Sequence, residues 1–489
     1  MSIRDRYAPS PTGLQHIGGV RTALFNYLYA RAQNGKFILR LEDTDRTRYD
    51  AAYVANLYDT FAWLNFSWDE GPDIGGEYKP YIQSERTELY KKYAEELLAK
   101  GQAYSCFCSP ERLDMVRKER EASHASETGY DRYCRGIDPK EAAQRAKTEP
   151  CTIRLKIPLG ATTRFSDTLL GDIEWKNDDV NPDPVLLKSD GFPTYHLANI
   201  VDDHLMKITH VLRAQEWLSS TPLHVILYKA FGWEPPAFCH LPMVMGQDGK
   251  KLSKRHGATS IDEFRKNGYL PDALINYIAL LGASYEEGKE IYTLAELAER
   301  FSLDKLNKAP AIFDYKKLEW YNALYIRMMD DNKLAQAALP FAINMNLFGN
   351  GAPNDKQKNM FAQAMPLVKE RAVFLSEIPQ KLTYLFSEPP VPAPEEFIPK
   401  KSTLEAAIKL LTLGRELLRE MAHLDDAGAE ELVKVKAESE QVKLGDLLMP
   451  LRVAITGARV SPPLFGSVRL LGAESCETRI DRALEKLRG

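Results

Sequence analysis

The stretch that decides the fold is Pro9-Ser10-Pro11-Thr12-Gly13-Leu14-Gln15-His16-Ile17-Gly18-Gly19. A short strand is predicted just before it, over residues 3–8, and apolar residues recur at helical spacing after it until Gly35. A second apolar run of strand length follows at 37–41. Strand, glycine turn, helix and strand form a βαβ unit, which predicts an α/β fold with a doubly wound parallel sheet of Rossmann type. A ligand is then expected at the carboxyl ends of the strands, where residues 10–19 and 42–45 fall.

A second stretch, Lys251-Leu252-Ser253-Lys254-Arg255, lies among glycines and is predicted to be a mobile loop. The first stretch offers backbone N–H groups, a helix N-terminus and His16 to a phosphate, and the second offers lysines. Each signal is weak alone, because a histidine beside glycine is usually incidental and a lysine-rich loop is usually solvated surface. Their joint occurrence indicates adenylyl or phosphoryl transfer, which needs positive charge where negative charge develops.

Length and composition limit the class of protein. A chain of 489 residues with 44% hydrophobic residues predicts three or four domains, and a net charge of −4 neither demands nor excludes a nucleic-acid partner. No stretch approaches the roughly 18 apolar residues that span a bilayer, and the first residues lack the apolar segment of a secretory signal. Six cysteines are too few for a disulfide framework. We therefore expect a cytoplasmic protein without a membrane partner.

Residues 9–19 resemble the "HIGH" signature of the class I aminoacyl-tRNA synthetases, and residues 251–255 resemble their "KMSKS" loop. The resemblance is closest to the bacterial glutamyl-tRNA synthetases and runs nearly end to end. It is carried further by residues 6–13, 40–45, 195–204, 213–217, 313–320 and 452–457. One departure is Gly19, which stands where the signature ends in histidine. His16 is then the only histidine of the pair, so the loop lysines are expected to carry more of the phosphate stabilisation.

The resemblance implies a domain order. Residues 1–103 and 186–257 would form the two halves of the Rossmann catalytic domain, with an inserted module at 104–185 that binds the acceptor end of tRNA. Residues 258–325 would contact the tRNA stem. Residues 326–489 would form a mostly α-helical anticodon-binding region in two parts, joined near 387–396 by the proline-rich stretch Pro389-Pro390-Val391-Pro392-Ala393-Pro394.

It also implies site residues for L-glutamate, ATP and Mg²⁺. A glutamate pocket needs a guanidinium for the side-chain carboxylate and an acid for the ammonium, which suits Arg6, Arg213 and Glu42. His16, Lys251 and Lys254 are expected to be catalytic. The substrate-binding set is Arg6, Ala8, Ser10, Glu42, Tyr195, Asn199 and Arg213. The ATP-binding set is Gly18, Glu216, Val244, Lys251, Leu252, Ser253, Lys254 and Arg255.

Three cysteines gather in the inserted module, at Cys106, Cys108 and Cys134. Some bacterial members of the family hold zinc on such a set, with a tyrosine four positions before the last cysteine as the fourth ligand, and Tyr130 matches that spacing. Because tyrosine is an uncommon zinc ligand, His124 and Asp131 stay open as alternatives. Reduced thiols without metal are the plain alternative to a zinc site.

The function expected from the resemblance is glutamate–tRNA ligation, with tRNA(Glu) as partner and a monomer as the working state. Charging of tRNA(Gln) as well stays open, as does a tRNA-independent adenylyl-forming enzyme of the same fold. The long helical tail argues against that second enzyme and against a truncated relative that glutamylates a modified base. Intact His16, Lys251 and Lys254 argue against a non-catalytic RNA-binding relative.

Overall fold

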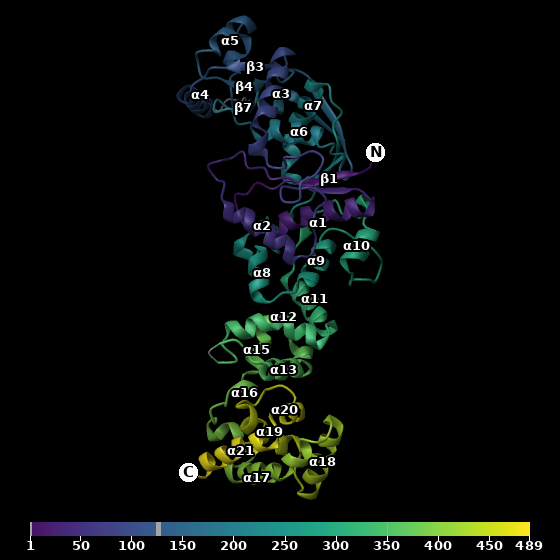
Figure 1. The fold of residues 1–489 in the computed structure, drawn as a ribbon, viewed down its shortest axis with the longest axis vertical. Helices are drawn as coiled ribbons and strands as arrows, with labels where there is room; N and C mark the ends of the chain where they lie inside the picture. Colours follow the sequence, from purple (N-terminus) through teal and green to yellow (C-terminus); the bar gives the residue numbers. More distant parts are fainter. Residues whose placement is uncertain (1, 124–128, 350) are drawn as a thin grey trace. The chain divides into compact units, whose positions relative to one another are not determined.

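The computed structural model describes residues 2–123, 129–349 and 351–489 (Figure 1). The chain divides into two compact units. The first unit consists of Met1–Glu263 and Ile275–Asp314, and the second consists of Phe264–Leu274 and Tyr315–Gly489. The finer domain bounds expected from the sequence stay a prediction. No helix among the described residues is long and apolar enough to cross a bilayer.

The first unit is built on a sheet in which β8, β9 and β5 run parallel and β6 joins β5 antiparallel at one edge. Strands β1 and β2 form a parallel pair, and β1 adjoins the start of β8, where the Thr209 N–H donates to the Arg4 carbonyl at 2.8 Å. The strands are β1 (Arg4–Tyr7), β2 (Lys36–Leu39), β3 (Ala103–Cys106), β4 (Thr152–Leu155), β5 (Thr162–Asp167), β6 (Gly171–Lys176), β7 (Val185–Leu187), β8 (His210–Ala214), β9 (Ala237–Leu241), β10 (Val244–Met245) and β11 (Ala311–Ile312). The α/β class and the Rossmann-type architecture are confirmed. The antiparallel edge strand β6 was not predicted from the sequence.

The predicted βαβ unit is present at the N-terminus. Helix α1 (Ile17–Ala32) packs against β1, β2 and β8, and its end is followed by Gly35. A Cβ atom on Gly35 would lie 2.4 Å from the Ile3 carbonyl oxygen, so only glycine lets the chain turn this closely into β2.

The segment between β3 and β7 is shared between two sheets, because its strands β5 and β6 belong to the four-stranded sheet with β9 and β8. Strands β3, β4 and β7 make a three-stranded antiparallel sheet. The helices of the first unit are α1, α2 (Ala51–Trp63), α3 (Thr87–Ala99), α4 (Pro110–Ala122), α5 (Pro139–Arg145), α6 (Tyr195–Leu205), α7 (Thr221–Phe231) and α10 (Leu294–Arg300). Helices α8 (Ile261–Asn267) and α9 (Pro271–Leu280) contribute residues to both units.

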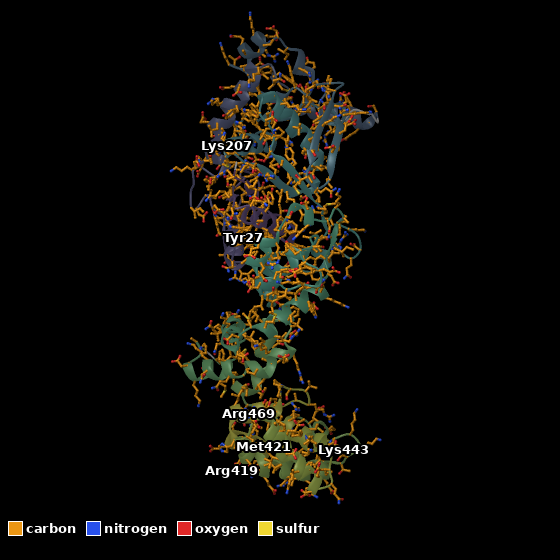
Figure 2. All side chains as sticks on the ribbon, turned by 90° about the vertical axis from the view of Figure 1, so that its right-hand side faces the viewer. Tyr27, Lys207, Arg419, Met421, Lys443 and Arg469 are labelled. Atoms are coloured by element: carbon orange, nitrogen blue, oxygen red, sulfur yellow. The ribbon has the colours of Figure 1, made fainter. Side chains whose placement is uncertain are left out.

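The second unit is helical, as expected. Its helices are α11 (Tyr315–Met328), α12 (Asp331–Asn344), α13 (Asp355–Gln363), α14 (Met365–Val368), α15 (Ile378–Lys381), α16 (Thr383–Phe386), α17 (Leu404–Met421), α18 (Asp426–Ser439), α19 (Leu444–Thr456), α20 (Leu464–Leu471) and α21 (Ala473–Arg488). Two apolar clusters form its interior, one from residues 270–385 and one from 397–487. Figure 2 labels Met421, which is buried in the later cluster, and Arg419, which pairs with Glu477.

Candidate active site

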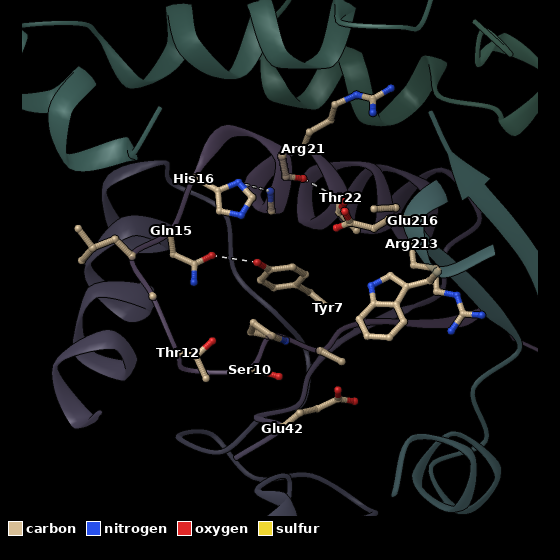
Figure 3. A pocket seen from close by; sticks show the side chains of 18 of the residues that line it. Tyr7, Ser10, Thr12, Gln15, His16, Arg21, Thr22, Glu42, Arg213 and Glu216 are labelled. Atoms are coloured by element: carbon tan, nitrogen blue, oxygen red, sulfur yellow. Dashed lines mark hydrogen bonds between the residues drawn. The ribbon is translucent and has the colours of Figure 1, made fainter. Parts of the chain in front are cut away.

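A cavity of about 1510 Å³ opens in the first unit (Figure 3). In this view His16 lies above its centre and Glu42 below, with Arg213 and Glu216 to one side. Its lining includes Arg6, Ala8, Ser10, His16, Gly18, Glu42, Tyr195, Arg213, Glu216, Val244, Lys251, Leu252, Ser253 and Lys254. Of the residues predicted for glutamate and ATP, only Asn199 and Arg255 are not on the lining. Asn199 is buried behind it and Arg255 is exposed on the loop.

The first motif places His16 at the N-cap of α1, where its Nδ1 accepts from the Gly19 N–H at 3.3 Å. This bond puts the imidazole proton of the neutral ring on Nε2. Partial enclosure by the cavity walls, and then the charge of Lys251, lower the pKa of His16 below its ordinary value. His16 is therefore a neutral donor rather than a fixed cation at neutral pH.

Backbone bonds join the first motif to the segment that directly follows the lysine loop. The Ile17 N–H donates to the Thr259 carbonyl at 3.0 Å, and the Ile261 N–H donates to the Gln15 carbonyl at 3.0 Å. His16 and Ser260 lie between these bonds as a single antiparallel bridge. The segment after the lysine loop is therefore hydrogen-bonded to the backbone of the glycine-rich turn.

The lysine loop has a defined shape. Residues 244–252 form a tight hairpin, in which the Leu252 N–H donates to the Val244 carbonyl at 3.0 Å. The short 3-10 turn Lys254–His256 follows, capped by reciprocal bonds between Ser253 and the His256 ring. The Lys251 ammonium lies 2.5 Å from a Glu216 carboxylate oxygen, and Lys254 is exposed at the cavity. Both lysines are exposed to solvent beside the space that a polyphosphate would occupy.

Beneath Glu42 lies a buried network of charges. Arg40 is fully buried and donates to Glu42 at 2.9 Å and to Asp203 at 2.7 Å. Arg6 binds Asp203 through Nε and Nη2, and both arginines donate to the Asn199 side-chain oxygen at 3.2 Å. Burial raises the pKa of Glu42 against the opposing charge of Arg40. Arg40 holds Glu42 in place at the cavity, where it is suited to accept an ammonium group.

Arg213 is held by histidine, threonine and tyrosine side chains, in contrast to Arg6 and Arg40, which bind carboxylates. Its guanidinium donates to His240, His224, Thr221 and the Tyr195 hydroxyl at 2.8–3.2 Å. Burial, and then the charge of Arg213, lower the pKa of His224 well below its ordinary value. The Tyr195 ring lies 4.4 Å from that of Trp217, so an aromatic wall stands beside this arginine.

Sequence reasoning missed several residues of this site. Arg21, Lys188 and Trp217 also line the cavity. Lys188 directly follows β7 and its apolar run Val185-Leu186-Leu187, so its position at a strand end was a usable signal. Nothing in the sequence linked Asp167 or His240 to Arg213, because they come from separate strands.

The three cysteines of the insert meet around Tyr130. Their sulfurs lie within 4.8 Å of one another, with Cys108 and Cys134 3.6 Å apart. The Tyr130 hydroxyl is 3.3 Å from the Cys106 sulfur. Asp131 instead pairs with Arg112 at 2.5 Å, and His124 lies outside the described residues. The sulfur spacing suits tetrahedral zinc, since Zn–S bonds of about 2.3 Å place sulfurs about 3.8 Å apart.

A glycine turn at a helix N-terminus and a lysine hairpin over one cavity define a nucleotide-using enzyme of the Rossmann type. The family described as "tRNA synthetases class I (E and Q), catalytic domain" matches residues 2–320, and an anticodon binding domain matches residues 333–484. The chain belongs to this class I tRNA synthetase family.

Its similarity to individual proteins covers the whole chain. It is 55% identical to a glutamate–tRNA ligase of Treponema denticola, covering 99% of each chain. It is 49% identical to a glutamate–tRNA ligase of Borrelia duttonii, covering 100% of this chain and 96% of the relative. A crystal structure of a glutamate tRNA ligase from Elizabethkingia meningosepticum, in complex with its amino acid, aligns with a TM-score of 0.85 at 35% identity, covering 100% of both chains.

Proposed function

We propose that the chain is a glutamate–tRNA ligase, which activates L-glutamate with ATP and transfers it to the terminal adenosine of tRNA(Glu). The observation that carries this function is the single cavity in which Glu42, Arg213 and the Lys251 hairpin meet. An acid and an arginine suit an amino acid with an additional carboxylate, and the lysines suit the polyphosphate of ATP. The full-length similarity to glutamate–tRNA ligases supports the same substrates.

The first step is attack of the glutamate α-carboxylate on the α-phosphate of ATP. A bond forms between the carboxylate oxygen and phosphorus, the bond to the bridging oxygen breaks, and pyrophosphate leaves with its electrons. His16 donates from Nε2 to a phosphate oxygen, and Lys251 and Lys254 meet the negative charge that develops on the phosphates. Mg²⁺ that arrives with ATP supplies further charge neutralisation. In the second step a ribose hydroxyl of the tRNA displaces AMP.

Different residues of the cavity wall recognise glutamate and ATP. Arg213 and Tyr195 meet the side-chain carboxylate of glutamate, Arg6 meets a carboxylate oxygen, and Glu42 meets the ammonium. Asn199 acts from behind the wall by orienting Arg6 and Tyr195. Ala8 and Ser10 complete the glutamate side, and Gly18, Glu216, Val244, Leu252 and Ser253 complete the ATP side. Arg255 would reach ATP from the exposed part of the loop.

Cys106, Cys108, Cys134 and Tyr130 would hold Zn²⁺ in the insert. The three sulfurs and the phenol oxygen already converge, and Asp131 is engaged by Arg112, so Tyr130 is the fourth ligand that best fits. Bound zinc would cross-link the end of β3 to the turn around Tyr130 and so stabilise the insert.

The rest of the chain binds tRNA. Residues 104–185 receive the acceptor end, residues 258–325 meet the stem, and residues 326–489 meet the anticodon, with strong salt dependence from phosphate contacts. The match of an anticodon binding domain to residues 333–484 supports the last assignment. The enzyme works as a monomer in the cytoplasm, and tRNA(Gln) is a second acceptor to test.

Charging assays on purified tRNA(Glu) and tRNA(Gln) test this function directly. We expect ATP-dependent glutamylation of tRNA(Glu), and a second signal on tRNA(Gln) would assign a non-discriminating enzyme. Adenylate formation without charging of any tRNA would favour the tRNA-independent alternative instead.

A further inference from the structure

Arg213 and His240 are paired residues on neighbouring parallel strands. They face each other as Cα partners on β8 and β9, and both are buried. Asp167 ends β5 on the far side of His240, and Thr221 and His224 reach Arg213 from α7. The guanidinium is therefore held by side chains from several separate elements rather than by a neighbour in sequence.

The bonds around Arg213 use four of its five N–H donors. Nε donates to His240 Nε2 at 3.1 Å, Nη1 donates to His224 Nδ1 at 3.1 Å and to the Tyr195 hydroxyl at 3.2 Å, and Nη2 donates to Thr221 Oγ1 at 2.8 Å. A guanidinium has five such donors, so one N–H on Nη2 is left for a ligand.

These bonds also determine which ring nitrogen of each histidine carries the proton. Arginine only donates, so His240 Nε2 and His224 Nδ1 must be unprotonated acceptors. A neutral His240 then carries its proton on Nδ1, which lies 2.6 Å from Asp167 Oδ2. His224 carries its proton on Nε2, which lies 3.1 Å from His196 Nδ1.

Neutral partners orient Arg213 without cancelling its charge. Arg6 offers the contrast, because Asp203 binds it directly and balances its charge. In the described parts of the chain no carboxylate is bonded to Arg213, and the nearest acid in its network, Asp167, is one imidazole ring away. A cation that is not neutralised by a neighbouring carboxylate favours a substrate carboxylate over the neutral amide of the same shape.

We propose that Asp167 and His240 are positioning residues for glutamate specificity. Asp167 fixes the His240 tautomer, and His240 fixes the direction in which Arg213 presents its free N–H and its charge to the side-chain carboxylate. This role rests on the proposed function, since it assigns a specificity device to the glutamate pocket of that reaction.

The test is Asp167→Asn, which keeps the size of the side chain. Asp167 Oδ1 accepts from two backbone N–H groups, those of Leu169 and Leu170, whereas Oδ2 accepts from one, that of His240 at 3.1 Å. The new amide nitrogen therefore falls at the Oδ2 position, where it gives up the bond to the His240 backbone N–H and donates to His240 Nδ1. His240 then carries its proton on Nε2, facing the Arg213 N–H. We expect the KM for glutamate in pyrophosphate exchange to rise about tenfold or more, and discrimination against glutamine to fall similarly, while the KM for ATP changes less than about twofold.

The matched control is Asp172→Asn, which removes an exposed carboxylate from the same hairpin and should leave all three values unchanged. An unchanged glutamate KM and unchanged discrimination in a folded Asp167→Asn enzyme would overturn the proposal. So would equal rises in both KM values, which indicate general damage.

A second measurement does not depend on the activity of any variant. Long-range ¹H–¹⁵N spectra of the wild-type enzyme labelled in histidine should show His240 as the Nδ1–H tautomer and His224 as the Nε2–H tautomer at neutral pH. An Nε2–H or doubly protonated His240 overturns the proposal, even if Asp167→Asn does not fold. Failure of the wild-type enzyme to form glutamyl-adenylate would instead contradict the proposed function, and the spectra would still report on the tautomers.

Discussion

Lys251 is bound to Glu216 across the mouth of the cavity, with 2.5 Å between the ammonium and a carboxylate oxygen. Both side chains are about half exposed, with relative exposures of 62% and 49%. An ion pair in this setting is worth roughly 0–1 kcal/mol, because water and salt screen it. The triphosphate of ATP can therefore replace Glu216 as the partner of Lys251 at little cost.

Lys254→Ala should slow adenylate formation while leaving glutamate binding little changed. The side chain is exposed at the cavity and carries charge that phosphoryl chemistry needs, so we expect a loss of about 100-fold or more in kcat for pyrophosphate exchange with tRNA present. Lys250→Ala is the matched control, since Lys250 is exposed on the same hairpin but does not line the cavity. Near wild-type exchange in folded Lys254→Ala would remove Lys254 from the catalytic set.

Arg213→Ala should weaken selection of glutamate over glutamine. The change removes the cation of the pocket, and we expect the ratio of kcat/KM values for the two amino acids to fall by about tenfold or more. Arg164→Ala is the control, because Arg164 is an exposed arginine paired with Glu174. Unchanged relative kinetics would take Arg213 out of the pocket.

Asp203→Asn should destabilise the enzyme in a pH-dependent way. Burial alone would raise the pKa of Asp203, but the charges of Arg6 and Arg40 outweigh it and hold that pKa below its ordinary value. The stabilisation is therefore complete above the unfolded value of about 3.9 and is lost as the pH falls through the lower native value.

We expect a loss of about 3 kcal/mol in the free energy of unfolding at neutral pH, measured by urea denaturation. The difference from wild type should stay constant down to about pH 4 and narrow below it. Glu95→Gln, at an exposed position of α3, serves as the control. A difference that grows on acidification would contradict the assigned ion pair.

Among the cysteines, zinc content should depend only on the clustered three. Purified protein is expected to hold one zinc per chain, and Cys134→Ser should lose it, because thiolates supply three of the four proposed ligands. Cys151→Ser is the matched control, since Cys151 lies outside the cluster. Elemental analysis after metal-free purification decides the matter, and a folded wild-type protein without zinc would disprove the site.

Gly414→Ala should destabilise the second unit. A Cβ atom on this residue of α17 would lie 2.4 Å from Leu451 Cδ1, and Leu451 is fully buried. We expect overpacking to cost about 1–3 kcal/mol, which outweighs the helix propensity gained. Gly445→Ala, where no atom lies within 4 Å of the new Cβ, should be neutral or slightly stabilising in the same thermal or urea unfolding measurement.

The features that the sequence predicted correctly are local ones. Glycines, apolar spacing and the two short motifs lie within a few residues of one another, so the N-terminal βαβ unit and the helical tail could be predicted directly. The antiparallel edge strand β6 could not, because its pairing depends on a turn within an irregular insert. The residues around Arg213 could not be predicted either, because His240 and Asp167 are brought near it only by the order of the strands in the sheet.

The backbone bonds between Gln15–Ile17 and Thr259–Ile261 anchor one end of the lysine hairpin, and the pairing of β10 with β11 anchors the other. Between these anchors, Gly257 has φ 129°, a conformation that other residues rarely adopt. The hairpin is thus attached to the rest of the first unit on both sides. Because one of these attachments is the turn that carries His16, a displacement of the hairpin on phosphate binding would be transmitted through backbone bonds to that turn.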